Sequence, residues 1–198
     1  LTLHRLARLD PSKRYVFGFH PHGNLVLSRI ALVGPSWDQL FPGVETRTLA
    51  ATPIFYFPGA REMSLALGAV DAGRQTAAAM LDEGKSLVLW PGGNREIFCN
   101  SPNRKETVLY LTRRLGFIKL AMRAGAPLVP TFVFGEKFAY NQIDMPEFVW
   151  RTVLRIFKMP VLVFWGRFFT WLPFRVDLGV VFGQPVEVPI VTDPTDDQ

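Results

Sequence analysis

Cysteine and histidine are the scarcest reactive residues in this chain of 198 residues. The single cysteine, Cys99, excludes an internal disulfide framework and is consistent with a reducing compartment. Of the three histidines, His20 and His22 stand two positions apart, so only His4 is left to help build a metal site. A histidine-rich metal centre is therefore disfavoured, and one completed by carboxylates would be poorly supplied with ligands.

Long hydrophobic runs are missing too. Spanning a bilayer takes roughly 18 consecutive apolar residues, and the nearest run, 159–174, is broken by Pro160, Arg167 and Pro173. No signal peptide is recognisable, and no nucleic-acid-binding module accompanies the dispersed basic residues. These absences favour a protein that touches a membrane rather than crosses it, unless a spanning segment precedes Leu1.

The abundant residues are apolar, aromatic and basic. Hydrophobic residues make up 48% of the chain and charged residues 20%, which excludes a disordered protein. The 17 Phe and 5 Trp residues suit a core together with apolar surface for a greasy ligand or a bilayer. A net charge of +5 favours anionic partners, and phosphate-bearing small molecules or lipid headgroups fit it better than nucleic acid does.

Apolar runs that stop at glycine or proline alternate with segments of helical periodicity. This pattern predicts a single α/β domain over residues 1–198, with a mostly parallel central sheet, flanking helices and an N-terminal arm at 1–13. Strands are expected at 15–20, 46–51, 86–90, 127–134, 176–182 and 185–188. Helices are expected at 62–67, 73–83, 112–124 and 147–158, with 24–33 helical or extended and 53–58 loop-like.

The first predicted strand ends in His20-Pro21-His22-Gly23. Sheets of this class place their sites at the carboxyl ends of strands, and a neutral imidazole can take a proton from a hydroxyl there. If the strand continued through the motif, His20 and His22 would point to the same side, one as the base and the other as its partner. A purely structural role and a His-x-His metal site, as in binuclear metallohydrolases, are the alternatives.

A glycine-rich turn, Pro91-Gly92-Gly93-Asn94-Arg95-Glu96, follows the predicted strand at 86–90. Gly92 and Gly93 could free backbone N–H groups to face a phosphate or a developing oxyanion. Arg95 could hold an anion, and Glu96 could orient an imidazolium. The alternative is a glycine-containing loop with a surface Arg-Glu pair.

Basic residues on and before the predicted helix at 112–124 could hold the phosphates of a nucleotide-like carrier, or simply form a solvated face. They are Arg104, Lys105, Arg113, Arg114, Lys119 and Arg123. Glu136 follows the predicted strand at 127–134 and could either face the site or hydrogen-bond to neighbouring backbone.

Together these segments resemble the diacylglycerol acyltransferase type 2 family, which includes monoacylglycerol and wax-alcohol acyltransferases. The resemblance covers residues 14–189, its most specific part is the His-Pro-His-Gly tetrad, and its late motifs are of the plant and algal style. The matching segments are 15–23, Pro91-Gly92-Gly93-Asn94-Arg95-Glu96, 114–121, 127–136, Phe164-Trp165-Gly166 and Leu172-Pro173-Phe174-Arg175.

The resemblance implies a glycerolipid acyltransferase-like α/β fold and an acyl-CoA-dependent O-acyltransferase that makes neutral lipid, with diacylglycerol the expected acceptor. It implies no cofactor, since acyl-CoA is a substrate. His22 would remove the proton of the acceptor hydroxyl with His20 as its positioning partner, and Glu96 would stabilise the imidazolium. A lysophospholipid, glycerol phosphate or wax-alcohol acceptor and a non-catalytic lipid-binding domain are the alternatives.

The resemblance also implies where acyl-CoA would bind. Oxyanion stabilisation and acyl-CoA binding are expected from Gly23, Gly92, Gly93, Asn94, Arg95, Arg114 and Lys119. An acyl tunnel is expected from Phe55, Phe57, Phe134, Phe164 and Trp165. No metal is expected.

One departure from the wider acyltransferase superfamily concerns the carboxylate beside the histidine. Many of those relatives carry Asp five positions after His, where this chain has Leu25 and Leu27, so Glu96 is expected to take that role. The resemblance further implies a hydrophobic membrane hairpin upstream of the His motif, which would precede Leu1. It also implies residence on the cytosolic face of the endoplasmic reticulum membrane and on lipid droplets.

Overall fold

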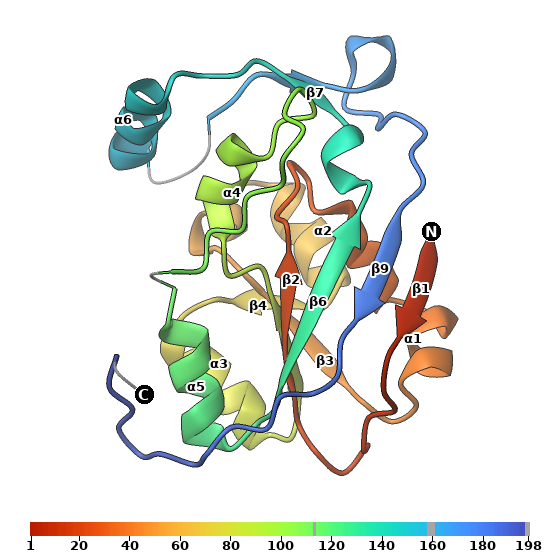
Figure 1. Ribbon diagram of the computed structural model, residues 1–198, viewed down its shortest axis with the longest axis vertical. Helices are drawn as coiled ribbons and strands as arrows, with labels where there is room; N and C mark the ends of the chain where they lie inside the picture. Colours follow the sequence, from red (N-terminus) through yellow and green to blue (C-terminus); the bar gives the residue numbers. More distant parts are fainter. Residues whose placement is uncertain (113, 158–160, 197–198) are drawn as a thin grey trace.

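A sheet of seven strands forms the centre of the computed structural model, which describes residues 1–112, 114–157 and 161–196 (Figure 1). The strands lie in the order β1-β9-β6-β2-β5-β3-β4. The five strands from β6 to β4 are parallel, β9 is antiparallel to β6, and β1 is parallel to β9. Their bounds are β1 Thr2–Arg5, β2 Val16–His20, β3 Thr46–Ala50, β4 Ala69–Asp71, β5 Ser86–Leu89, β6 Leu128–Phe134 and β9 Gly179–Phe182.

The predicted α/β class with a mostly parallel sheet is confirmed, and helices flank that sheet. The α-helices are α1 Pro35–Leu40, α2 Ala60–Ala66, α3 Arg74–Asp82, α4 Gly93–Cys99, α5 Gly116–Ala124 and α6 Glu147–Phe157. Short 3-10 helices are η1 Leu27–Leu32, η2 Thr52–Tyr56, η3 Glu136–Phe138 and η4 Arg167–Phe169. A separate two-stranded ribbon pairs β7 (Asn141–Gln142) with β8 (Phe164–Trp165).

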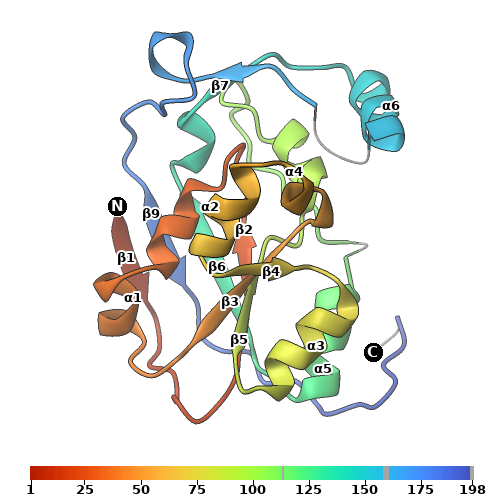
Figure 2. The same ribbon diagram turned by 180° about the vertical axis from the view of Figure 1, so that it is seen from behind.

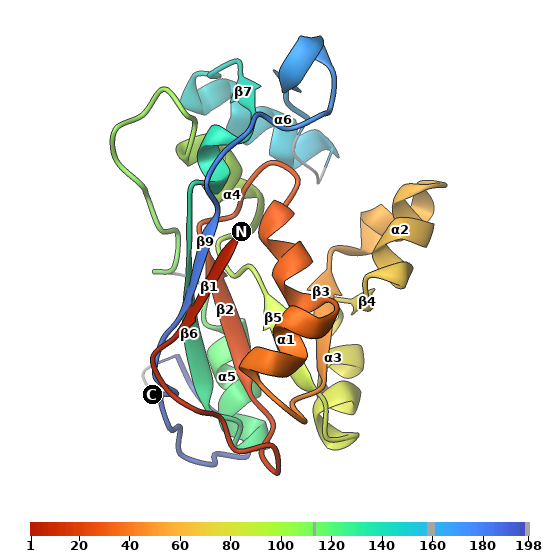
Figure 3. The ribbon, with the colours of Figure 1, turned by 90° about the vertical axis from the view of Figure 1, so that its right-hand side faces the viewer.

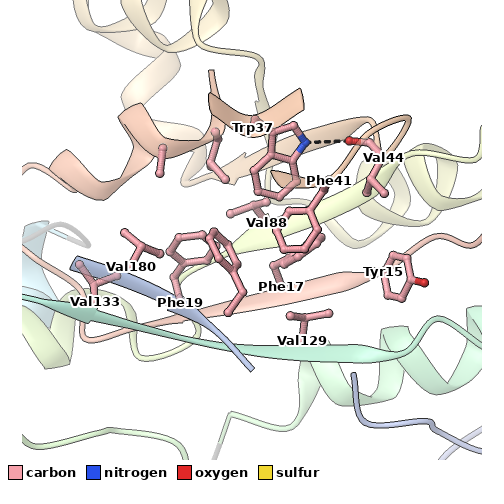
Figure 4. Close-up of a cluster of buried hydrophobic side chains, with 13 residues drawn as sticks. Tyr15, Phe17, Phe19, Trp37, Phe41, Val44, Val88, Val129, Val133 and Val180 are labelled. Carbon is pink, nitrogen blue, oxygen red and sulfur yellow. Dashed lines mark hydrogen bonds between the residues drawn. The ribbon is translucent and has the colours of Figure 1, made fainter. Parts of the chain in front are cut away.

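The central strand β2 is buried on both faces, which explains why it is a continuous apolar run rather than an alternating one. On one face Phe17 and Phe19 pack with Phe182 of β9, with Trp37 of α1 and with Phe41, which follows α1 (Figure 4). Burying an aromatic ring of this size contributes roughly 1.5–3 kcal/mol. The aromatic face therefore holds the strand, and the motif at its end, firmly in place.

The opposite face of the sheet is covered by α3 and α5, which lie side by side in Figures 1 and 2. Val16 of β2 packs there in a cluster with Leu81 of α3 and Ala121 of α5. The predicted helix at 73–83 matches α3. The predicted helix at 112–124 begins only at Gly116, because residues before it form a turn in which the Arg114 N–H donates to the Leu111 carbonyl.

Several predicted elements are wrong or incomplete. The expected N-terminal arm contains a strand, β1, because Thr2–Arg5 pair with β9 along the sheet edge. The expected strand at 185–188 is reduced to one bridge, between Leu128 and Val186. The segment at 24–33 contains the 3-10 helix η1, and the loop expected at 53–58 contains η2. The turn expected after Trp90 leads directly into α4, and β4 and α1 were not expected.

Residues 141–157 and 161–175, here called the cap, lie beyond the carboxyl ends of β2 and β6 (Figures 1 and 3). The cap holds the ribbon β7–β8, η4 and the amphipathic helix α6, which matches the prediction at 147–158 up to Phe157; residue 158 is outside the described residues. No helix within the described ranges combines the length and hydrophobicity needed to cross a membrane.

Candidate active site

His20 is the last residue of β2 and stands at the carboxyl edge of the sheet, between β5 and β6. It is 8% exposed, and its register partner on β6 is Phe132. Because β2 ends at His20, His22 belongs to the following loop rather than to the strand. The strand alternation that would point both imidazoles to the same side therefore does not apply.

Glu96 of α4 has a buried carboxylate that hydrogen-bonds to this motif. Its side chain is fully buried and accepts three hydrogen bonds: from Nδ1 of His20 at 3.0 Å, from the backbone N–H of His22 at 2.8 Å and from the backbone N–H of Tyr110 at 2.8 Å. Burial raises the pKa of a carboxyl group, but these three donors outweigh it and hold the pKa of Glu96 below its ordinary value. Glu96 is therefore a charged anchor that joins three separate segments.

Glycine is required at position 92 by the same carboxylate. A Cβ placed on Gly92 would lie 1.8 Å from Cδ of Glu96 and 2.4 Å from its Cγ. The backbone of Gly92 has ordinary right-handed helical angles, so the need for glycine is steric and comes from the Glu96 side chain alone. The glycine-rich turn thus makes room for the anchor.

His22 has a different environment from His20. Its Nδ1 lies 2.7 Å from the carbonyl oxygen of Gly23. A carbonyl only accepts hydrogen bonds, so Nδ1 carries the hydrogen and Nε2 keeps its lone pair in the neutral ring. Burial lowers the pKa of His22 below its ordinary value, and the Gly23 hydrogen bond and the charge of Glu96 oppose that shift only partly. His22 is therefore neutral near neutral pH, with Nε2 able to accept a proton.

This geometry corrects one expectation about Glu96. The carboxylate was expected to pair with the imidazole of His22, but its side-chain partner is the imidazole of His20. His22 receives only a backbone contact from Glu96, because the ring turns toward the Gly23 carbonyl instead. Glu96 is therefore a carboxylate beside a motif histidine, but that histidine is His20.

The expected backbone donors are only partly free. The N–H of Gly93 donates to the Trp90 carbonyl at 3.1 Å, so it closes the turn and does not face a developing oxyanion. The carbonyl of Gly23 accepts the hydrogen on Nδ1 of His22, and the anion-binding role expected of Gly23 stays a prediction. Asn94 is half-buried on α4. For Gly92 the oxyanion role stays a prediction.

Two of the expected cations lie on or beside the glycine-rich segment that contains Gly93 and Glu96. Arg95 is exposed, hydrogen-bonds to the Tyr110 hydroxyl and stacks over its ring at 4.9 Å. Arg114 is exposed too, and its Nη2 lies 3.9 Å from the place where a Cβ of Gly93 would stand. Their position beside Gly93 and Glu96 suits an anionic ligand that enters from solvent.

Two of the other expected cations, Lys119 and Arg123, are held in ion pairs. Lys119 pairs with Asp196 at 2.5 Å, and Arg123 pairs with Asp193 at 3.2 Å. These ion pairs join α5 to the C-terminal segment, so the structure does not bring Lys119 to the histidines. Arg104 and Lys105 are exposed on the loop after α4. Arg113 lies outside the described residues.

The five residues expected to line an acyl tunnel are spread over three places. Phe55 is half-buried in η2, followed by Phe57, which is half exposed. Phe134 ends β6 and is exposed, packing on Phe132. Phe164 and Trp165 form β8, against Tyr140 and Phe169 respectively. Two shallow cavities, near Arg14 and near Trp37, include none of the five, and the tunnel stays a prediction.

Three contributors to the site carried no recognisable sequence signal. They are the Tyr110 N–H on Glu96, the Trp90 ring against His22 at 6.4 Å, and Ser28, which binds Glu136. They act through backbone N–H groups, ring packing and, for Ser28, a hydroxyl as well, none of which spacing along a chain reveals. Glu136 was placed at a strand end but left open between two roles; its carboxylate binds Ser28 and faces the motif loop.

Within the described ranges, no group of three or more His, Cys, Asp and Glu side chains could hold a metal ion. His20 and His22 instead direct their Nδ1 atoms to Glu96 and to the Gly23 carbonyl. Both imidazoles are thus oriented by hydrogen bonds through Nδ1.

The chain matches the diacylglycerol acyltransferase family over residues 1–198. Diacylglycerol O-acyltransferase 1 of Schizosaccharomyces pombe is 32% identical over 218 residues, covering 100% of this chain and 61% of the relative. The human 2-acylglycerol O-acyltransferase 3 is 31% identical over 215 residues, covering 100% of this chain and 62% of the relative. The chain thus spans about three fifths of the length of these relatives.

Among solved structures, a crystal structure of the 1-acyl-sn-glycerophosphate acyltransferase from Thermotoga maritima is similar, with a TM-score of 0.53 and 14% sequence identity. It covers 94% of this chain, and this chain covers 61% of it. At that identity the likeness establishes the fold, which is the fold of a glycerolipid acyltransferase.

Proposed function

Because this chain belongs to the diacylglycerol acyltransferase family, we propose that it transfers the acyl group of an acyl-CoA to the free hydroxyl of diacylglycerol, forming triacylglycerol. The observation that carries the proposal is the pair of imidazoles at the carboxyl edge of β2. One is held by a buried carboxylate, and the other is neutral with Nε2 free. An acyl transfer to an alcohol needs such a base, because a neutral hydroxyl is a weak nucleophile.

His22 serves as the general base in this proposal. Its Nε2 takes the proton of the acceptor hydroxyl as the oxygen attacks the thioester carbonyl carbon. The carbon–sulfur bond then breaks, the ester remains, and the CoA thiolate takes the proton back from the imidazolium. His22 returns to its neutral form, so atoms and charge balance over one turnover.

Glu96 and His20 support that base. The negative charge of Glu96 raises the pKa of His22 and so favours the imidazolium that forms in the transition state. Its hydrogen bonds to the His22 N–H and to His20 hold the loop in position. Direct transfer needs no acyl-enzyme, and burial raises the pKa of the Cys99 thiol, which leaves it a poor nucleophile.

Acyl-CoA would bring its phosphates to the exposed guanidinium groups of Arg95 and Arg114, because both lie beside the site. The acyl chain and the glycerolipid would enter from the cap. Its most exposed apolar side chains include Phe168 at 83%, Phe169 at 86% and Trp171 at 78%. An apolar surface of this kind beside the site suits docking on the endoplasmic reticulum membrane or on lipid droplets.

A substrate panel tests the proposal. Purified protein is given radiolabelled acyl-CoA with diacylglycerol, monoacylglycerol, a long-chain alcohol or a lysophospholipid, and the products are separated. We expect the greatest turnover with diacylglycerol and none in the double variant H20A/H22A, whose folding is checked by circular dichroism. Preferential acylation of the lysophospholipid, or full activity in the double variant, would refute it.

A further inference from the structure

Glu136 is a second buried carboxyl group beside the motif, and acid–base transfer by His22 does not use it. It follows β6 and is 3% exposed. Oε1 accepts the backbone N–H of Ser28 at 3.0 Å, and Oε2 accepts the Ser28 hydroxyl at 2.9 Å. Burial raises the pKa of Glu136, and hydrogen bonds from Ser28 and the Leu27 backbone oppose that rise only partly. Burying such a group has a free-energy cost, which these few donors offset incompletely.

The side chain of Glu136 lies directly against the backbone of Gly23. A Cβ on Gly23 would stand 2.6 Å from Cγ of Glu136 and 2.8 Å from its Cδ. No larger residue fits at position 23 unless Glu136 moves, and Ser28 prevents that movement by holding both carboxylate oxygens. Glu136, held by Ser28, therefore limits the space into which the backbone at Gly23 can move.

Gly23 also contacts His22, the base of the proposed function. The carbonyl of Gly23 accepts the hydrogen on Nδ1 of His22 at 2.7 Å. We propose that Glu136, held by Ser28, is a positioning residue that fixes the Gly23 backbone and thereby sets the tautomer of His22. This inference rests on the proposed role of His22 as the base.

The tautomer matters because only one of the two leaves Nε2 free. If the Gly23 carbonyl turned away, the hydrogen of the neutral ring could settle on Nε2, which then could not accept the proton of the acceptor. The charged or titratable groups that act on His22 are Glu96 of α4 and His20 of β2. Neither hydrogen-bonds to the His22 ring, so the Gly23 carbonyl is the group that selects the tautomer.

The first test reads the tautomer without using activity. Nitrogen–proton correlation spectra of protein carrying isotope-labelled histidine distinguish a hydrogen on Nδ1 from one on Nε2, and H4Q and H20N variants assign the signals. We expect His22 to carry its hydrogen on Nδ1 in the unmodified protein. In Glu136→Ala and Ser28→Ala we expect a mixture of tautomers. An unchanged His22 signal in both variants would overturn the inference.

The matched control is Ser86→Ala. Ser86 is a buried serine at the amino end of β5, and its hydroxyl oxygen accepts the backbone N–H of Tyr15 at 3.0 Å. Losing this hydrogen bond should lower stability as Ser28→Ala does but leave the His22 signals alone. Glu136→Gln should keep the Nδ1 tautomer, because glutamine fills the same space and its oxygen still accepts the Ser28 N–H. If Glu136→Ala fails to fold, Ser28→Ala and Glu136→Gln decide the matter.

Kinetics give the second test. Misplacing the base should lower kcat about tenfold in Ser28→Ala and Glu136→Ala, with KM little changed. The Gly23 hydrogen bond raises the pKa of His22, so its loss lowers that pKa further and moves the acidic limb of the pH–rate profile to lower pH. Ser86→Ala should shift neither. An inactive unmodified protein would refute the proposed function. If His22→Ala is inactive but Ser28→Ala and Glu136→Ala keep the pH–rate profile of the unmodified protein, only this inference is refuted.

Discussion

The two motif histidines differ in what holds them, and substitution should separate their roles. Replacing His22 with Ala removes the proposed base and should lower kcat by about 10²–10⁴-fold. Replacing His20 with Ala leaves that base but frees one partner of Glu96, so we expect a smaller loss. Initial rates with saturating acyl-CoA and acceptor measure both effects.

His4 supplies the control for these variants. It is the third histidine of the chain and lies on the edge strand β1. His4→Gln should retain the full rate. If His20→Ala were as inactive as the double variant while His22→Ala stayed active, the base would be His20, whose Nδ1 is bound by Glu96.

Gly92 gives a steric prediction about the anchor. Its Cβ would stand 1.8 Å from Cδ of Glu96, so Gly92→Ala must displace the carboxylate from His20, from the His22 loop or from Tyr110. Overpacking of this kind costs about 1–3 kcal/mol, and we expect a lower Tm together with loss of activity. Thermal unfolding and initial rates check both.

Gly116→Ala is the matched control, because Gly116 is the first residue of α5 and a Cβ added to it would have no other atom within 4 Å. Alanine is favoured over glycine in a helix. This variant should keep the activity and the Tm of the unmodified protein. Equal behaviour of Gly92→Ala would contradict the view that Glu96 must stay where it is.

At the scale of elements, the loop after α4 is tied to the site by a clamp. Asn100 donates to the Val108 carbonyl at 2.8 Å and accepts the Val108 N–H at 2.7 Å. Two residues later, the Tyr110 N–H reaches Glu96. Asn100→Ala removes two hydrogen bonds worth about 1 kcal/mol each, so the loop should open more often and kcat should fall severalfold.

Limited trypsin digestion checks the loop directly, because Arg104 and Lys105 lie exposed within it. We expect faster cleavage there in Asn100→Ala than in the unmodified protein. Asn103→Ala is the control: the side chain of Asn103, on the same loop, donates to the exposed Asp144 at 3.3 Å. Equal cleavage rates in the two variants would show that the clamp does not hold the loop.

Strands of the sheet centre could be predicted because both faces are buried and their runs stop at turn residues. The strands β2 and β5 follow that rule closely. In β6 only alternate residues are buried, and its apolar run before Gly135 is what predicted it. The edge strand β1 could not, since its exposed residues alternate weakly and its existence depends on pairing with β9. The helix α4 was hidden for another reason: its first residue, Gly93, is one that usually ends a helix.

The site was predictable in part by the same logic. Residues that end parallel strands share one edge, so His20, the turn at Gly92 and Glu136 could be placed together from the strand positions. Glu96 could be assigned only from its place in the motif that contains this turn. The pairing of Glu96 with His20 rather than His22 could not, because it depends on where β2 stops and how the loop then turns. The contribution of Tyr110 depends on a backbone N–H group, which every residue but proline carries. Ser28 adds its hydroxyl to such an N–H group, but no spacing in the sequence marks it as the partner of Glu136.

At the scale of the whole molecule, one end carries the two motif histidines, the exposed side chains of Arg95 and Arg114, and the cap. The parallel strands β2, β5 and β6 all finish at this end, and Figures 1 and 3 show the cap beyond them. A water-soluble thioester and an apolar acceptor must meet at one base, so exposed basic and exposed apolar side chains at the same end suit the proposed reaction.

The cap gives the last prediction, which concerns membrane docking. Phe168, Phe169 and Trp171 are each more than three quarters exposed. Moving such a side chain into the interface of a bilayer contributes about 1 kcal/mol, so replacing all three with Ser should lower partitioning into vesicles about a hundredfold. Sedimentation with phosphatidylcholine vesicles containing phosphatidylserine measures this partitioning.

The control replaces Leu6 and Ile190, exposed apolar residues outside the cap at 63% and 79%, and should leave binding unchanged. Equal loss in both variants would mean that binding reflects exposed apolar area anywhere on the molecule, and the cap would then have no special part in bringing the histidines to the lipid.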